Sequence, residues 1–168
     1  MEQLFLTESM HHLNTYMQRI ETACAALSEA EIWWRPHQRA LSIGTTLLHL
    51  NGNITQWVIS GLYGQPDNRN RAAEFDNSLQ PEKLFLLEQL KQTIGKANTV
   101  IINLNEAKLM SAYSIQGFET TGLQATYHVV EHLSWHCAQI TYISKLLQGE
   151  SFNFSFYNTE ALNNSKNK

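Results

Sequence analysis

Cysteine, an excess of basic residues and long apolar runs are all missing or scarce in this sequence of 168 residues. Its two cysteines, Cys24 and Cys137, lie far apart in the chain, so a disulfide framework is not expected. Lysine and arginine number 12 against 15 aspartates and glutamates, which gives a net charge of -3. Proteins that bind nucleic acid usually gather basic residues on one face, so we expect no nucleic-acid partner.

Targeting segments are missing as well. No stretch reaches the roughly 18 consecutive apolar residues that a membrane-spanning helix needs, so we expect no membrane segment. The first residues, MEQLFLTESM, lack the basic and apolar regions of a secretory signal. Because the chain has neither a signal nor a disulfide framework, the reducing cytoplasm is the expected compartment.

Four helical patterns make up most of the chain. The first predicts a helix over residues 6–27, because apolar residues recur there at alternating spacings of four and three, as in a helix packed in a bundle. They are Leu6, Met10, Leu13, Met17, Ile20, Cys24 and Leu27. A second helix is predicted to begin after Ser42, a favourable N-cap residue, and to end before Gly64.

The two remaining helices have their own start and stop signals. Pro81 suits the first turn of a third helix, whose core positions are predicted at Leu84, Leu87, Ile94, Ile101 and Leu104. A capping box formed by Thr121 and Gln124 predicts the start of a fourth helix, which runs to about residue 147 and stops at Gly149. A capping box from Ser28 to Glu31 predicts a short helical turn between the first two helices.

These elements predict an all-α fold, a four-helix bundle with long crossover connections. Residues 64–80 are polar and rich in turn formers, so we expect a long crossover on the surface, and residues 105–120 form a second connector. One domain is expected over residues 1–150. The C-terminal tail, residues 151–168, alternates aromatic and polar residues at first and is expected to be partly docked on the bundle or disordered.

Three histidines on the fourth helix follow one another at spacings of four. Residues four apart in a helix lie one turn apart on nearly the same face, so two such imidazoles can converge on one metal ion. At about 100° per residue, His136 falls within the apolar arc of this helix, His132 falls on its edge, and His128 lies further round. His132 and His136 are therefore the better ligand pair. Hydrogen-bonded core histidines are the alternative, and spacing alone does not separate the two.

A polar stripe on the second helix supplies a candidate third ligand. His49 lies beside Thr45, Asn53 and Gln56, next to the apolar face of that helix. Two interpretations are open at this point. The stripe is either a solvent-exposed face, or part of a site in which His49 binds metal with the two amides as neighbours.

These stretches resemble the DinB/YfiT-like superfamily of bacterial metal-dependent proteins. SIGTTLLHLNGNITQWVISG (residues 42–61) is similar to that family's second helix, and HVVEHLSWHCAQITYISKLL (residues 128–147) to its fourth, where the signature is His-x3-His-x2-Gln. EIWWRPHQRALSIG, DNRNRAAEF and FETTG also fit, so the resemblance spans roughly residues 5–148. Many relatives have glycine where this chain has Ala138.

The resemblance implies a four-helix bundle, often a homodimer, that holds a divalent metal ion, commonly zinc or nickel. Mapped onto this chain, the implied ligands are His49, His132 and His136. Gln139 is implied as a neighbour of the ligands. His128 lies outside the three-histidine pattern, and we expect it to be a partly exposed structural residue.

Three histidine ligands leave a position open on a zinc-like ion, which is typical of catalytic sites. Relatives include transferases and isomerases that use low-molecular-weight thiols, so the resemblance implies a thiol S-transferase-like enzyme acting on a small electrophile. A metal-dependent hydrolase, a non-catalytic metal-binding or stress-associated protein, and a vestigial site are the alternatives. The catalytic residues are unknown at this stage.

Overall fold

The structure is a computed structural model that describes residues 2–76 and 78–155. The chain is mostly helical, as predicted. In order, its elements are α1 (Glu2–Cys24), α2 (Glu29–Ile32), α3 (Ile43–Ile54), the π-helical segment η1 (Thr55–Leu62), α4 (Arg71–Glu74), α5 (Lys83–Ile102), α6 (Glu106–Met110), β1 (Ala112–Ile115), β2 (Phe118–Thr121), α7 (Gly122–Gln148) and the 3-10 segment η2 (Gly149–Ser151).

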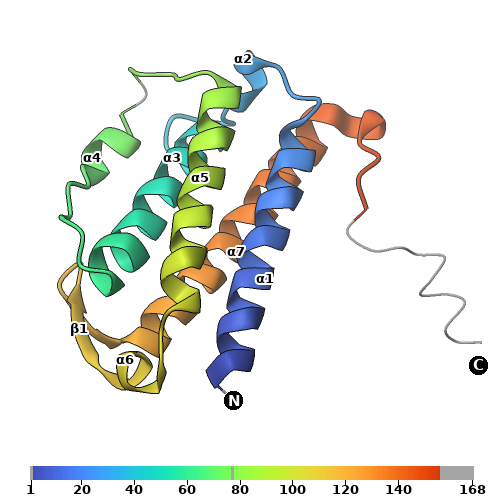
Figure 1. The fold of residues 1–168 in the computed structure, drawn as a ribbon. Helices are drawn as coiled ribbons and strands as arrows, with labels where there is room; N and C mark the ends of the chain where they lie inside the picture. The colour runs from blue at the N-terminus through green and yellow to red at the C-terminus, as the bar shows by residue number, and fades with distance from the viewer. Residues whose placement is uncertain (1, 77, 156–168) are drawn as a thin grey trace, which may run out of the picture.

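Four long helices lie side by side around one core. Helix α1 packs against α5 and α7, and α3 packs against the same two helices from the other side. Figure 1 shows that α1 and α7 run in one direction while α3 and α5 run in the other. Because α3 and α5 are parallel, the chain between them must return along the length of the molecule. Residues 63–82 make this return, carry α4, and form the predicted crossover.

Several predicted start and stop signals are where helices begin and end, but Pro81 lies outside α5, which begins at Lys83 after the N-cap residue Glu82. Ser42 caps α3 by accepting a hydrogen bond from the backbone N–H of Thr45, and capping boxes are present at Ser28 and Thr121. Helix α7 ends at Gly149, whose positive φ of 55° is a conformation that favours glycine. Local capping chemistry therefore determines these ends independently of the packing.

The core stripe of the first helix is confirmed, and that of the third helix is confirmed at Ile94, Ile101 and Leu104 but corrected at its start. Along α1 the predicted apolar residues are buried, apart from Met10, which is half-buried. In α5, Leu84 was predicted to face the core but is 72% exposed, whereas Leu86 and Leu90 are buried. Two residues correspond to about 200° around a helix, so Leu84 and Leu86 point in nearly opposite directions. The stripe of α5 runs through Leu86, Leu90, Ile94, Ala97 and Ile101.

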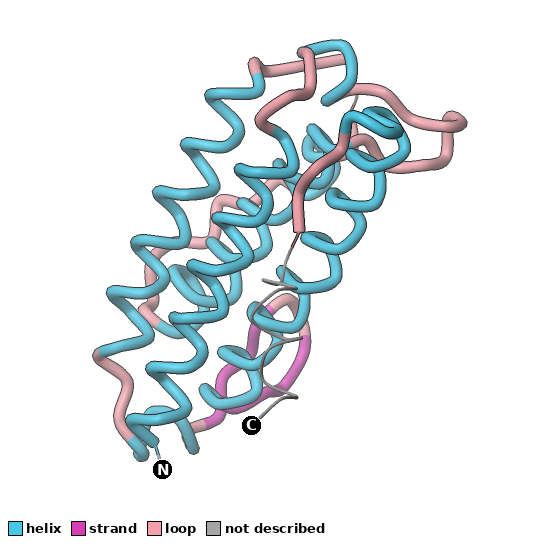
Figure 2. Tube along the Cα trace, turned by 90° about the vertical axis from the view of Figure 1, so that its right-hand side faces the viewer, coloured by secondary structure: helices cyan, strands magenta, loops and turns pink. Residues whose placement is uncertain are grey.

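The second predicted connector contains an unpredicted β-hairpin. Strands β1 and β2 pair antiparallel around a two-residue turn of Gln116 and Gly117, both with positive φ, as hairpin turns of this length require. Figure 2 shows the hairpin at the end of the molecule where α1 begins. The side chain of Ile115 packs on Gly61, and Trp57 Nε1 donates to Gln116 Oε1 at 3.3 Å. The hairpin therefore covers η1.

Two further expectations concern membranes and the tail. Over the part of the chain that the structure describes, no helix combines the length and the apolar character needed to cross a membrane. Of the predicted tail, residues 156–168 lie outside the described residues. Within the described part, Lys145 lies 5.4 Å from the ring centre of Phe152, which places the start of the tail beside α7.

The corrected face of α5 can be tested by a pair of truncations. Leu90→Ala removes a fully buried side chain, so we expect the free energy of unfolding to fall by about 2–5 kcal/mol. Leu84→Ala alters an exposed residue, so a change within about 0.5 kcal/mol is expected. Urea denaturation of both variants measures the difference. Equal losses of stability at the two positions would show that Leu84 faces the core, as the sequence predicted.

Candidate metal centre

The structure brings the three predicted histidines together. His49 comes from α3, and His132 and His136 come from successive turns of α7. The Nε2 atom of His132 lies 3.2 Å from His49 Nε2 and 3.2 Å from His136 Nε2. All three ligand atoms lie within 4.8 Å of one another, the geometry of a group that could hold a metal ion.

The polar stripe of α3 faces inward. His49 is 8% exposed and Asn53 is 4% exposed, and Thr45 is buried as well. The interpretation of this stripe as a solvent-exposed face is therefore wrong. Because α3 packs against α7, the stripe meets the histidine edge of α7, and two polar faces enclose the site.

Hydrogen bonds indicate which ring nitrogens carry the protons. His49 Nδ1 lies 3.1 Å from Glu74 Oε2, and His136 Nδ1 lies 2.8 Å from Gln139 Oε1. Both oxygens are acceptors, so each Nδ1 is the protonated nitrogen and each Nε2 presents a lone pair toward His132. Arg69 Nη2 also lies 3.2 Å from His49 Nδ1, but both groups are donors, and Arg69 Nη2 donates instead to Glu74 Oε2 at 2.8 Å.

This arrangement fits a divalent metal ion. Zinc–nitrogen bonds are about 2.0–2.1 Å long, and two ligands of a tetrahedral ion then stand about 3.3 Å apart, close to the 3.2 Å separations observed here. Imidazole nitrogens suit zinc and nickel alike. His132 Nδ1 is buried and lacks a hydrogen-bond partner among the described residues, so no hydrogen bond there dictates which nitrogen of His132 is protonated.

Burial keeps the imidazoles of His132 and His136 neutral. The pKa of His132 is lowered to about 3, first by its removal from water and then by the neighbouring His136 and His49. Burial also lowers the pKa of His136 below its ordinary value. Neutral imidazole is the form that binds metal, so both side chains are in the form that could hold an ion near neutral pH.

His128 lies next to this group without joining it. Its ring packs against Trp57 at a tilt of 35°, with centroids 4.0 Å apart, and its Nε2 lies 3.3 Å from Asn53 Nδ2. Burial lowers its pKa. His128 is half-buried and forms a second polar layer with Asn53, one turn away from the three converging nitrogens.

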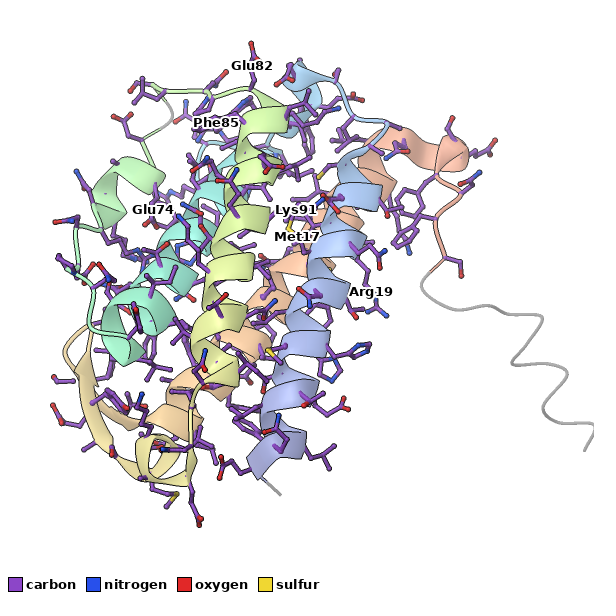
Figure 3. The ribbon with its side chains drawn as sticks, viewed as in Figure 1. Met17, Arg19, Glu74, Glu82, Phe85 and Lys91 are labelled. Carbon is purple, nitrogen blue, oxygen red and sulfur yellow. The ribbon has the colours of Figure 1, made fainter. Side chains whose placement is uncertain are left out.

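Two residues of the site were missed from the sequence, Arg69 and Glu74. Both lie on the crossover, and Figure 3 shows Glu74 between α4 and α3. Arg69 Nε donates to Glu74 Oε1 at 2.6 Å, and its side chain is only 3% exposed. Burial opposes ionisation of Glu74, but hydrogen bonds from Arg69 and His49 outweigh it and lower the pKa of the carboxyl. The only indication in the sequence was two opposite charges five residues apart in a polar segment. A search for helical periodicity does not find such a pair.

Comparison with known proteins gives a family and a fold. The model of a family described as "Protein of unknown function (DUF1572)" matches residues 1–156. One similar solved structure is described as the crystal structure of the conserved protein of locus from Enterococcus faecalis, with a TM-score of 0.66, 17% sequence identity, and coverage of 86% of this chain and 97% of that chain. At that identity the likeness shows the fold alone. No curated protein matches the chain.

The lowered pKa values predict how the metal-free protein responds to acid. Between pH 6.5 and the lower folded-state pKa, His132 takes up a proton only when the chain unfolds. Stability in the presence of a chelator should therefore fall as the pH is lowered from about 6.5 toward 5. Denaturant titrations of wild type and His132→Gln at each pH measure this, and the variant should show the shallower dependence. Parallel curves would contradict the assignment.

Proposed function

The chain belongs to the DUF1572 family of unknown function, and we propose from its site that it is a divalent-metal-dependent enzyme that transfers a small thiol onto an electrophile. We propose also that its packed helices form a four-helix bundle of the DinB/YfiT-like kind. The observation that carries the function is the convergence of three histidine nitrogens, which no further ligand atom joins among the described residues.

The number of ligands favours catalysis over a purely structural ion. Structural zinc sites are closed by four protein ligands, whereas catalytic sites combine three protein ligands with an open position. Among the described residues, the group contains His49, His132 and His136 without a fourth cysteine, histidine or carboxylate. Glu74 is engaged with the opposite nitrogen of His49 and with Arg69.

The charges around the site favour an anionic ligand. The three histidines contribute no negative charge, and the carboxylate of Glu74 is already paired with the guanidinium of Arg69. A divalent ion held there would supply a positive charge and an open position that favour the thiolate form of a thiol. In the transfer, the S–H bond breaks and its proton passes to water. A sulfur–carbon bond then forms on the electrophile, whose leaving group departs with the bonding electrons.

The chain's own thiols are unsuitable for this role. Cys24 and Cys137 are buried, and burial raises the pKa of Cys24 to about 12 and that of Cys137 to about 11. Thiolates are the reactive form of cysteine, so neither side chain is a nucleophile at neutral pH. This supports a low-molecular-weight thiol as the sulfur donor. A homodimer in the cytoplasm remains our prediction for the assembly and its location.

Metal content is the first test of the proposal. Wild-type protein prepared without a histidine tag should contain about one zinc or nickel ion per chain, and His132→Ala and His136→Ala should lose it because each removes one of three ligands. Plasma mass spectrometry measures the content, with His37→Ala, an exposed histidine away from the site, as the control. Folded wild-type protein that takes up no added metal would overturn the proposal.

Activity distinguishes a transferase from a hydrolase. The metal-loaded protein should consume a small electrophile such as a chloronitrobenzene only when a low-molecular-weight thiol is present. The rate should fall by at least about tenfold in His136→Ala, since the ligand set is broken. Absorbance of the thioether product reports the reaction. Metal-dependent hydrolysis of ester substrates with no need for thiol would favour the hydrolase, and a bound metal without either activity would favour a non-catalytic metal protein.

Thiol accessibility tests the exclusion of the two cysteines. Native protein should react with a disulfide reagent such as dithionitrobenzoate far more slowly than denatured protein, because both sulfurs are buried and protonated. The double variant Cys24→Ala/Cys137→Ala should keep its thiol-transfer rate if it folds. A variant that folds and binds metal but loses transfer would place a catalytic thiol within the chain.

A further inference from the structure

The crossover contributes an ion pair that touches the candidate metal centre from outside. Arg69 and Glu74 form two hydrogen bonds, from Nε to Oε1 at 2.6 Å and from Nη2 to Oε2 at 2.8 Å. The same Oε2 lies 3.1 Å from His49 Nδ1. The carboxylate therefore links the crossover to the ring nitrogen that faces away from His132.

Gly52 of α3 leaves the space that this ion pair occupies. A Cβ atom at Gly52 would overlap the Glu74 carboxylate and would lie 2.9 Å from Arg69 Nε. A Cβ atom does not approach an oxygen or nitrogen atom so closely unless one of them moves. Any larger residue at position 52 would therefore push the Arg69–Glu74 pair away from the helix. By contrast, a Cβ atom at Gly95 of α5 would have no neighbour within 4 Å.

Several polar contacts and one ring contact join the described residues of this part of the crossover to the helix beneath it. Helix α4 is four residues long and buries none of them. Phe75 packs against the ring of His49, with centroids 5.3 Å apart. Arg69 Nη1 donates to Gln56 Oε1 at 2.7 Å, and Gln56 Nε2 donates to Asp67 Oδ2 at 2.7 Å. Arg69 therefore stands at the centre of the polar contacts that join the crossover to His49 of α3, through Glu74, and to Gln56 of η1.

We propose that Arg69 and Glu74, in contact with Gly52, are positioning residues that fix His49 with its proton on Nδ1 and its Nε2 toward His132. The proposal rests on the metal-dependent function above and extends it to the crossover. Because a fixed ligand binds metal better than a mobile one, docking of residues 66–76 and binding of metal favour each other. Coupling between two equilibria is reciprocal, so each should report on the other.

Zinc affinity measures one direction of this coupling, which is the effect of the Arg69–Glu74 pair on metal binding. Gly52→Ala displaces the pair while all three histidines remain, and Glu74→Gln removes the charge that accepts from His49. Each should weaken zinc binding by about 10–100-fold, the usual effect of losing an outer partner of a metal ligand. Competition with a chelating dye gives the constants, and circular dichroism verifies folding. Gly95→Ala and Glu21→Gln, which alters the exposed ion pair with Lys91, are the matched controls and should bind as wild type does.

Hydrogen exchange measures the other direction of this coupling, which is the effect of zinc on the docking of residues 66–76. Zinc should slow amide exchange over residues 66–76 in the wild type and in Gly95→Ala. The same addition should leave exchange in this segment nearly unchanged in Gly52→Ala, where the link between site and crossover is broken. Variants at Gly52 and Glu74 that bind zinc as tightly as wild type, or equal protection in all proteins, would overturn the proposal.

The tautomer of His49 separates this proposal from the metal function. In the metal-free protein, nitrogen-15 spectra should show His49 protonated on Nδ1, and Glu74→Gln and Gly52→Ala should lose this preference. A wild type without metal affinity that still shows the preference and its loss would refute the enzyme but retain the positioning role. Tight zinc binding in every variant, with an unchanged tautomer, would refute the positioning role and retain the metal site.

Discussion

The contact between α3 and α7 brings the Nε2 atoms of three imidazoles close together, and side chains outside this cluster hold the rings in place. His132 Nε2 stands 3.2 Å from each of two other Nε2 atoms. Lone pairs that face one another at this distance repel unless a proton or a cation lies between them. The outer nitrogens of His49 and His136 are therefore held by acceptors, Glu74 and Gln139. The direction of each ring depends on a partner outside the cluster.

The topology explains how one of those partners reaches the site. Since α3 and α5 run parallel, the chain must travel back along the molecule between them, and this return passes over the outer side of α3. A short helix on the return then presents Glu74 to His49, with Arg69 beside it. The connection thus supplies part of the site, in addition to joining two helices. At Gly52, α3 has no side chain, and this leaves room for Glu74 and Arg69.

Periodicity and capping were the basis of the correct predictions from the sequence. The spacing of His132 and His136, together with the apolar arc of α7, was enough to place both rings at the inner edge of that helix. The stripe of α1, the start of α3 and both ends of α7 followed from local rules that do not depend on distant residues. The same approach failed at the start of α5, because Leu84 and Leu86 are both leucines and only the packing of neighbouring helices decides which one is buried.

By itself the sequence determined the four long helices, most of their inward faces and the histidine pair, because these depend on residues within one or two turns of each other. Only the tertiary structure decided that the polar stripe of α3 faces α7, that His49 meets His132 across 83 residues of chain, and that Arg69 and Glu74 belong to the site. Contacts of this kind follow from how helices pack and how a connection is routed. A polar segment with charges of both signs is compatible with a solvated loop until the helix beneath it, and the glycine that leaves it room, are seen in place.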